Sequence, residues 1–405
     1  MFGLLLLAVL GAENAAPEEA KPTEPAPGYW YAFHLTGEWG GARTWLEEHG
    51  VSFDIIYAAE VFANASQAEG GDNSALSGHL DLAITLETEG LGLWPGGTFY
   101  AVGQTNHGLG INQRVGSSTE ISNIEAPPYV QLGEFFFEQS LFKELITIRL
   151  GKQDANREFG TPRFGGNFIN NNFGLIPSTP FPSYPTNGLG AALIVNPLEW
   201  LFFRAMLIEG KPQVGSFGFD TAFVPDAGHF FIASVAAKHT FGANDKNTGT
   251  SSAGFFRQQG PIAEVGDVPM PRTFESNSGF FVQHDERLYV QPEDKDDVRC
   301  FTWISRVGWS QPDRTLISFF VGSSLAYHGL GARSDDTVGI GFGYFTVQQQ
   351  RNGTPGPGSE FFVELFYKWR LTHFISLQPD LQYYRTPGGD GRDALLVGVR
   401  LKLKG

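Results

Sequence analysis

Apolar and polar residues alternate along three segments near the C-terminal end of the chain. In residues 361–371 every odd position is apolar, while Glu364, Lys368 and Arg370 occupy even positions. Residues 375–383 and 395–403 show the same alternation. A period of two places successive side chains on opposite faces of a β-strand. The pattern therefore predicts three strands, with a turn over residues 386–391 before the last one.

Shorter alternating segments occur earlier in the chain. They cover residues 53–61, 80–87, 146–150, 203–207, 301–309 and 339–344. At about ten residues per strand, about 350 residues of this kind suggest roughly 16 strands. No linker interrupts them, so we predict a single all-β domain over residues 51–405, a transmembrane antiparallel β-barrel.

The membrane part of this prediction depends on the apolar faces. A soluble, half-buried sheet would give the same alternation. The apolar faces carry aromatic residues at their ends, including Tyr367, Trp369 and Tyr383, as the interfacial girdles of membrane barrels do. No stretch after residue 29 reaches 18 apolar residues. If the domain lies in a membrane, it must therefore be a closed barrel, because lipid cannot satisfy unpaired backbone groups.

Composition and charge narrow the function classes. The 51 Gly and 24 Pro disfavour a helical bundle, and the mean hydropathy of -0.15 excludes a chain with many membrane-spanning helices. The net charge of -15 argues against a nucleic-acid partner, which requires a basic surface. One cysteine, Cys300, excludes an intramolecular disulfide and a cysteine-based zinc site. The nine His show no local metal-binding spacing, and the acidic run 292–297 does not fit a calcium loop. We expect no cofactor and no metal.

The N-terminal region is different in character from the rest. Residues 2–12 are apolar and are followed by small residues, which predicts a signal peptide over 1–16; a lone buried helix is the alternative. Residues 17–34 form a spacer rich in Pro and Glu. A helix is expected over 38–49, ending at Gly50, within a periplasmic segment 35–50 that precedes the first strand.

Four stretches, in this order along the chain, resemble the carbohydrate-selective porin (OprB) family. They are Leu35-Thr36-Gly37-Glu38-Trp39-Gly40-Gly41-Ala42-Arg43, Leu150-Gly151-Lys152-Gln153-Asp154-Ala155-Asn156, Leu189-Gly190-Ala191 with Asn196-Pro197, and Leu377-Gln378-Pro379-Asp380-Leu381-Gln382-Tyr383 with Asp393-Ala394-Leu395-Leu396-Val397-Gly398-Val399-Arg400-Leu401. Together they span residues 35–403.

The resemblance implies a 16-stranded barrel in the outer membrane of a Gram-negative-type bacterium. It implies passive diffusion of small sugars, monosaccharides such as glucose, through a narrow constriction of charged and polar side chains, and no enzymatic activity. Sugars, outer-membrane lipid and the barrel-assembly machinery would be the partners. One departure is the last segment, Lys402-Leu403-Lys404-Gly405, where outer-membrane barrels often finish on an aromatic residue.

Two sets of residues are candidates for the pore lining. The first set is the inward positions of the predicted strands: Glu60, Arg149, Glu364, Lys368, Arg370, Asp380, Gln382, Arg400 and Lys402. An alternative role for this set is a ladder of ion pairs that braces the wall.

The second set lies in a long Gly-, Asn- and Pro-rich stretch that reaches Gly190. Long loops without regular structure are usually functional, and a loop of this kind can fold inward and narrow the lumen of a barrel. A solvated surface loop is the alternative. The candidate residues are Lys152, Asp154, Asn156, Arg157, Arg163 and Asn170. Five aromatic residues of the stretch could stack on sugars or simply pack the loop: Phe164, Phe168, Phe173, Phe181 and Tyr184.

The N-terminal motif of Trp39, Gly40, Gly41 and Arg43 is interpreted as structural, with Arg43 paired to the barrel rim. Two further functions remain open at this point. One is a porin that is general or selective for other solutes. The other is a secreted all-β protein that binds or hydrolyses carbohydrate, which would need two carboxylates about 5–10 Å apart.

Overall fold

The computed structural model describes residues 34–66, 73–219, 222, 227–241, 247–266, 270–290, 299–348, 357–389 and 391–405. The predicted signal peptide at 1–16, nearly all of the spacer at 17–34 and the acidic run at 292–297 lie outside the described residues.

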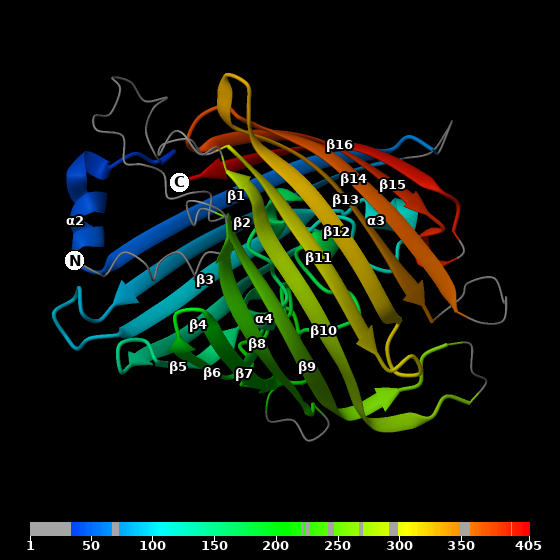
Figure 1. The fold of residues 1–405 in the computed structure, drawn as a ribbon, viewed down its shortest axis with the longest axis horizontal. Coiled ribbons are helices and arrows are strands. Elements are labelled where there is room, and N and C mark those ends of the chain that lie inside the picture. The colour runs from blue at the N-terminus through cyan, green and yellow to red at the C-terminus, as the bar shows by residue number, and fades with distance from the viewer. Residues whose placement is uncertain are drawn as a thin grey trace.

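The described residues form sixteen strands that close into one barrel, which confirms the predicted fold class (Figure 1). Each strand pairs antiparallel with its sequence neighbours, and β1 closes the ring against β16, with Glu60 opposite Arg400. The strands are β1 (Val51–Asn64), β2 (Ser74–Glu87), β3 (Gly97–Gly108), β4 (Tyr129–Leu141), β5 (Ile146–Gln153), β6 (Gly188–Leu198), β7 (Leu201–Glu209), β8 (His229–Phe241), β9 (Asn247–Ala263), β10 (Thr273–Val290), β11 (Cys300–Ser310), β12 (Ile317–Leu330), β13 (Arg333–Val347), β14 (Gly358–Arg370), β15 (Ile375–Arg385) and β16 (Ala394–Lys404).

The predicted alternation corresponds to an outer and an inner face. On β1, Val61 is 42% exposed, whereas the neighbouring Glu60 is 5% exposed. The same contrast separates Leu365 from Glu364 on β14 and Val397 from Leu396 on β16. Apolar side chains that are exposed on a closed barrel face the lipid in a membrane. The buried positions face the interior of the barrel.

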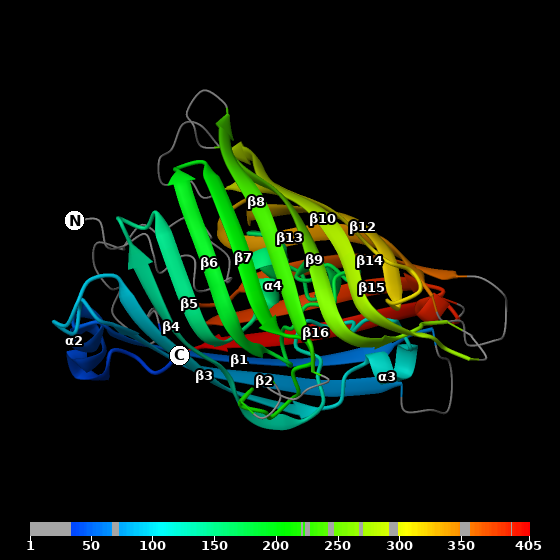
Figure 2. The same cartoon turned by 90° about the horizontal axis from the view of Figure 1, so that it is seen from below.

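The connections differ between the two ends of the barrel. At one end they include the short turns 142–145, 199–200, 331–332 and 371–374. At the other end two long loops, 109–128 and 154–187, turn into the barrel; Figure 2 shows α4 enclosed by the strands. The loops contain α3 (Asn112–Val115), α4 (Ala155–Phe159), η3 (Gly165–Asn167) and η4 (Asn171–Phe173); η5 (Pro387–Gly389) lies between β15 and β16. Among the described residues, no helix is long and apolar enough to cross a membrane.

A short helix precedes β1, as the sequence predicted. It comprises η2 (Trp39–Gly41) and α2 (Ala42–Glu48), so regular α-helix covers less than the predicted range 38–49. Gly40 and Gly41 have φ values of 70° and 94°, which permit the tight turn into α2. These values lie outside the helical range, so the regular α-helix begins only at Ala42.

Arg43 connects this helix to both sides of the barrel seam, which is the junction between β1 and β16. It is 1% exposed, and its Nη2 donates to the carbonyl oxygens of Phe53 at 2.7 Å and of Gly405 at 3.1 Å. Its guanidinium also lies 5.2 Å from the centre of the Trp39 ring, which packs in turn on Phe53. These contacts are consistent with the structural role predicted for the motif of Trp39, Gly40, Gly41 and Arg43.

The apolar core lies inside the barrel, between loop 154–187 and the wall. Loop residues Phe159, Phe168, Ile169, Phe173 and Ile176 are each at most 2% exposed. They pack against inward-facing wall residues that include Phe230, Phe256, Phe281, Phe320, Phe345, Phe362 and Phe366. One part of the barrel interior is therefore filled by this loop rather than open to water.

Candidate functional site

A cavity of about 390 Å³ remains inside the barrel beside the two inserted loops. Its wall comes from inward-facing residues of β1–β4 and β14–β16, namely Ile56, Ala58, His79, Asp81, Gln104, Glu134, Lys368, Ser376, Gln378, Arg400 and Lys402. The loops complete the lining with residues that include Glu120, Ser122, Glu125, Asp154, Asn156, Arg157 and Tyr184. Most of these side chains can donate or accept hydrogen bonds, and they include charges of both signs.

The start of loop 154–187 is fixed by acidic and basic groups around Glu134. The Asp154 carboxylate caps α4 by accepting the Asn156 N–H at 2.8 Å, and the Asp154 N–H donates to Glu134 at 3.0 Å. Arg157 forms an ion pair with the same Glu134 carboxylate. Burial, and then the neighbouring Glu134, raises the pKa of Asp154. This corner of the cavity therefore holds two carboxylates and one guanidinium in close contact.

Helix α4 is tied to the wall by a second charged group. Glu158 accepts from Arg149 Nη1 at 2.9 Å and lies 3.5 Å from Arg204, while Arg149 also binds Glu138 at 2.7 Å. Burial alone would raise the pKa of Glu158, but Arg149 and Arg204 outweigh it and hold that pKa below its ordinary range. Arg149 thus anchors the loop and does not line the cavity.

The middle of loop 154–187 is held by β14 and β15. The Glu364 carboxylate accepts two consecutive backbone N–H groups, from Ile169 at 2.7 Å and from Asn170 at 3.0 Å. The Asn170 amide donates to Gln382 at 2.9 Å and to Tyr384. Because all these groups are buried, each bond is protected from competition by water.

Arg306 on β11 holds the loop from another side of the barrel. Its guanidinium donates to the carbonyl oxygens of Gly160 at 2.8 Å, Leu175 at 2.8 Å and Asn172. Arg306 is 2% exposed, so one buried cation gathers three segments of the same loop. This geometry fits the planar, multiply donating guanidinium and would not suit lysine.

Glycines on β13 leave room for the loop aromatics. A Cβ on Gly341 would lie 2.3 Å from the Phe173 ring, and one on Gly339 would lie 2.5 Å from Phe366 and 3.2 Å from Phe168. Strand glycines often mark a close approach of other groups. The alternating glycines of β13 therefore form a surface into which the loop packs.

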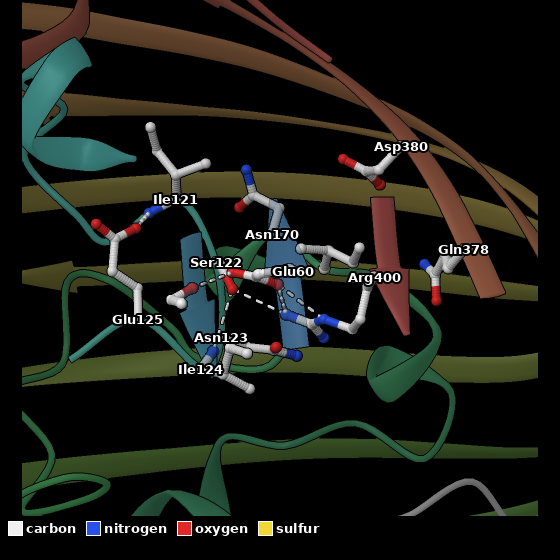
Figure 3. A network of polar contacts seen from close by, with 12 residues as sticks. Glu60, Ile121, Ser122, Asn123, Ile124, Glu125, Asn170, Gln378, Asp380 and Arg400 are labelled. Atoms are coloured by element: carbon white, nitrogen blue, oxygen red, sulfur yellow. Dashed lines mark hydrogen bonds and ion pairs between the residues drawn. The ribbon is translucent and has the colours of Figure 1, made fainter. Parts of the chain in front are cut away.

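Loop 109–128 adds to the first loop inside the barrel (Figure 3). Ser122 and Asn170 form an antiparallel bridge, and the Asn123 N–H donates to Ile169 O at 2.9 Å. Arg400 joins this pair to the wall, because it donates to Ser122 Oγ at 2.8 Å and to Glu60 at 2.6 Å. The two loops therefore form one inserted unit, which the ion pair of Arg400 and Glu60 connects to the wall.

Glu125 is, with Glu120, one of two acidic residues of loop 109–128 that line the cavity. Its carboxylate accepts the N–H groups of Asn112 at 2.9 Å and Ile121 at 3.2 Å. Burial raises the pKa of Glu125 to about 7 in spite of these bonds. The charge of this side chain therefore changes near neutral pH.

Tyr184 brings an aromatic ring and a hydroxyl to the cavity. Its hydroxyl lies 3.0 Å from Asn106 Oδ1 and 3.1 Å from Ile124 O, and its ring stands edge-on to His79 at 5.0 Å. His79 in turn contacts Asp81 at 3.0 Å. The other four aromatic residues proposed for sugar stacking have a packing role here: Phe164, Phe168 and Phe173 are buried, and Phe181 contacts Phe230 and Phe281.

The structure divides the sequence-derived candidates into three groups. Those that line the cavity are Asp154, Asn156, Arg157, Lys368, Arg400 and Lys402. Those that hold the inserted loops or the wall are Glu60, Arg149, Asn170, Glu364 and Gln382, together with Asp380, which accepts from Gln382 at 2.9 Å. Three more lie apart from the cavity lining: Lys152 donates to Leu132 O and Ser216 O, Arg163 to Thr248, and Arg370 to His373 O.

Sequence reasoning missed Arg306 as an anchor and His79, Asp81 and Glu125 as cavity residues. The β11 alternation placed Arg306 on the polar face, but nothing local showed that it would meet a loop. A group suited to a metal was not found in the cavity among the described residues; the one described cluster, His239, His284 and Glu286, lies elsewhere.

Comparison with family models identifies the chain. Residues 72–404 match the model of the carbohydrate-selective porin, OprB family. Porin B of Pseudomonas aeruginosa is 21% identical over 418 residues, which cover 91% of this chain and 90% of that protein. The putative porin QuiX of Acinetobacter baylyi is 19% identical over 461 residues, covering 99% of this chain and 98% of its own.

Solved structures support the fold. The high-pH structure of Pseudomonas putida OprB superposes with a TM-score of 0.79 at 18% identity, covering 93% of this chain and 99% of that one. Its low-pH structure gives a TM-score of 0.61 at 16% identity with the same coverage. At these identities the likeness establishes the barrel architecture alone.

Proposed function

Because this chain belongs to the carbohydrate-selective porin (OprB) family, we propose that its cavity passes small sugars, monosaccharides such as glucose, into the periplasm by passive diffusion. The outer membrane of a Gram-negative bacterium is its location, as for the family. The proposed path runs between the inserted loops and the polar wall of β1–β4 and β14–β16.

One observation carries the proposal: the polar cavity between the inserted loops and the barrel wall is small and is lined by charges of both signs. About 390 Å³ falls near the low end of the roughly 300–1,000 Å³ typical of small-molecule sites. Asp81, Glu134, Asp154 and Glu125 offer carboxylate oxygens, and Arg157, Arg400, Lys368 and Lys402 offer cationic donors. An uncharged polyol can replace its hydration shell at such a wall, because charged groups form the stronger hydrogen bonds.

The same wall disfavours simple ions. A cation or an anion meets groups of its own sign along the path, whereas a sugar hydroxyl both donates and accepts. Binding must remain weak and shared among several groups, because a diffusing solute has to leave again. No covalent step is required, so the proposal needs no catalytic group.

Liposome swelling tests the proposal directly. Purified protein in liposomes should admit glucose and xylose several-fold faster than amino acids or salts of similar size. It should also admit monosaccharides faster than a trisaccharide. Equal rates for sugars, amino acids and salts would show a general pore and contradict the proposed selectivity.

Two matched arginine variants test the assigned path. Arg400 lies near the middle of β16 and Arg370 at the end of β14; both occupy inward positions, but of the two only Arg400 lines the cavity. Arg400→Gln should change the rate of glucose entry by at least a few-fold, and Arg370→Gln should leave it unchanged. Normal migration of both variants on unboiled gels would show that assembly is intact. Equal effects of the two variants would place the path elsewhere.

We also infer the domain organisation. Residues 1–16 act as the signal peptide, 17–34 as a spacer and 35–50 as a periplasmic segment before the barrel of 51–405. The position of α2 at the end with the short turns supports this, because short turns face the periplasm in outer-membrane barrels. Assembly would involve the barrel-assembly machinery.

A further inference from the structure

Three side chains that can bind metal ions meet on the outer face of the barrel. His239 on β8 and His284 and Glu286 on β10 each place a donor atom within 4.8 Å of the others. They share the outward face of Val235 and Val282, which are 39% and 50% exposed. The cluster is therefore separated from the cavity by the barrel wall.

Strand register explains how β8 and β10 reach each other across β9. His239 and Glu286 both stand opposite Gly249, one from each side. A Cβ on Gly249 would lie 2.4 Å from His239 Nε2, so the ring occupies the space that any other residue would fill. His239 Nε2 consequently lies 3.8 Å from Glu286 Oε1. Gly249 is thus the position that permits the cluster.

His284 completes the group with a defined orientation. Its Nε2 lies 3.2 Å from Glu286 Oε2, and its Nδ1 lies 2.9 Å from Ser251 Oγ. The ring stacks on His239 at 5.6 Å with an angle of 6° between planes, and Trp303 stands edge-on at 5.0 Å. When Nδ1 donates its proton to Ser251, Nε2 presents a lone pair toward Glu286. A partner on the far ring nitrogen is a regular support of metal-binding histidines.

We propose that His239, His284 and Glu286 bind a divalent metal ion of the zinc type. Two imidazole nitrogens and one carboxylate are a donor set that Zn²⁺ uses, with a fourth position left for water. Zinc–ligand bonds of about 2.0–2.2 Å place donors roughly 3.3 Å apart, so the contacts from Glu286 need only small side-chain rotations. Hard cations such as Mg²⁺ prefer oxygen ligands and should not bind here.

The ion can reach this position from water. His239 lies two positions before the end of β8, and Gly249 lies two positions after the start of β9. At about 3.3 Å per residue the site is roughly 7 Å from the C-terminal end of β8 and the N-terminal end of β9, at the end of the barrel with the short turns. The His239 side chain is 40% exposed. A bound ion would link β8 to β10 across β9.

Isothermal titration of ZnCl₂ into the detergent-solubilised full chain, without an affinity tag, tests the site. We expect one Zn²⁺ per chain, and no heat from MgCl₂. His284→Ala and Glu286→Gln should each weaken binding at least tenfold, and Gly249→Ala should weaken it as well by displacing His239. Zn²⁺ should also raise the temperature at which unboiled wild-type protein unfolds, and should not do so for Glu286→Gln.

The chain offers a matched control at the other end of the barrel. His107 on β3 lies over Gly78 as His239 lies over Gly249, with a hypothetical Gly78 Cβ at 2.4 Å from the ring. Its neighbour is the Tyr57 hydroxyl at 3.1 Å instead of a carboxylate. His107→Ala should therefore bind Zn²⁺ like the wild type.

Several outcomes would overturn the site. Absence of Zn²⁺ binding by the wild type would do so, as would unchanged affinity in both His284→Ala and Glu286→Gln, or an equal loss in His107→Ala. If His284→Ala does not assemble, Glu286→Gln and Ser251→Ala decide the question. Sugar flux plays no part in this readout, so the result is independent of the proposed transport function.

Discussion

Two regions of the inner barrel wall differ in their balance of aromatic and polar side chains. From β8 to β13 the inward positions include Phe230, Phe256, Phe281, Phe320 and Phe345, which share one apolar core with residues of loop 154–187, and the polar anchor Arg306. From β16 through β4 they carry Arg400, Glu60, His79, Asp81, Gln104 and Glu134, most of which border the cavity or hold its lining. The loop thus has an apolar back and a polar front.

This difference shows how a wide barrel can form a narrow path. A sixteen-stranded barrel encloses an aqueous channel unless something fills it. Here the filling is attached by apolar packing and by buried polar anchors on β4 and β5, on β11, and on β14 and β15. The path is therefore defined by the front of the loop, and its width depends on how firmly the back is held.

Loss of the Arg306 anchor should have the largest effect. Arg306→Ala removes three hydrogen bonds from a charged donor, each worth about 1.5–3 kcal/mol, and leaves buried carbonyls unpaired. We expect the loop to leave the wall, with a several-fold rise in single-channel conductance and loss of sugar selectivity. Planar-bilayer recording measures both. Arg272→Ala, at an exposed ion pair with Glu264, is the control and should behave as wild type.

A bulkier residue at Gly341 should have the next largest effect. Gly341→Val places atoms where the Phe173 ring lies, since even a Cβ would be 2.3 Å away. Such overpacking costs about 1–3 kcal/mol and should lower the unfolding temperature of unboiled protein while widening the path. At Gly103 the nearest atom to a Cβ is 3.9 Å away, so Gly103→Val is the matched control. Equal destabilisation by the two variants would mean that loop packing on β13 is unimportant.

On the polar side, Tyr184→Phe should have a moderate effect. The hydroxyl lies 3.0 Å from Asn106 Oδ1 and 3.1 Å from Ile124 O and donates its one proton to either of them, so the variant loses that donor. The cost should be about 1 kcal/mol. Glucose flux should change about two-fold or more, whereas the unfolding temperature should change little. Liposome swelling and gel migration separate the two; a large stability loss with unchanged flux would contradict a lining role.

The smallest expected effect is a pH dependence from Glu125. Burial raises the pKa of this carboxyl to about 7, so it gains a negative charge as the pH rises through neutrality. Cation-over-anion selectivity in bilayer recordings should increase between pH 6 and pH 8, and Glu125→Gln should remove that step. Because the folded state retains this proton to a higher pH than the unfolded state, the same ionisation lowers folding stability as the pH rises. A step that persists in Glu125→Gln would have another origin.

The sequence predicted some strands far better than others, and the wall comparison explains why. Strands β14–β16 have one lipid-facing and one largely polar face, so their period of two is clear. In β8 the inward Phe230 and Ile232 alternate with the outward Phe231 and Val235, and all are apolar. The covering loop removes the need for polar residues on the inner face. Alternation consequently disappears where the loop packs, and that strand could be expected only from the overall count.

The site was predictable only in part for a similar reason. The long stretch after β5 indicated an inserted loop by its length and its Gly, Asn and Pro content. Which side it would lean on depended on Arg306 and on the β13 glycines, more than 130 positions away along the chain. Ser122 joins Asn170 through backbone bonds that carry no side-chain signal. Burial decided which inward charges became anchors and which line the cavity.

The hydrogen bonds from Arg43 to Phe53 O and Gly405 O can form only at a late stage of barrel formation. The two carbonyls lie on opposite sides of the seam between β1 and β16, so a single guanidinium can bind both only after the ring has closed. An interaction that forms after closure cannot speed it, but it slows reopening, because such late contacts act mainly on the unfolding rate. We therefore expect loss of Arg43 to shorten the lifetime of the closed barrel more than it slows barrel formation.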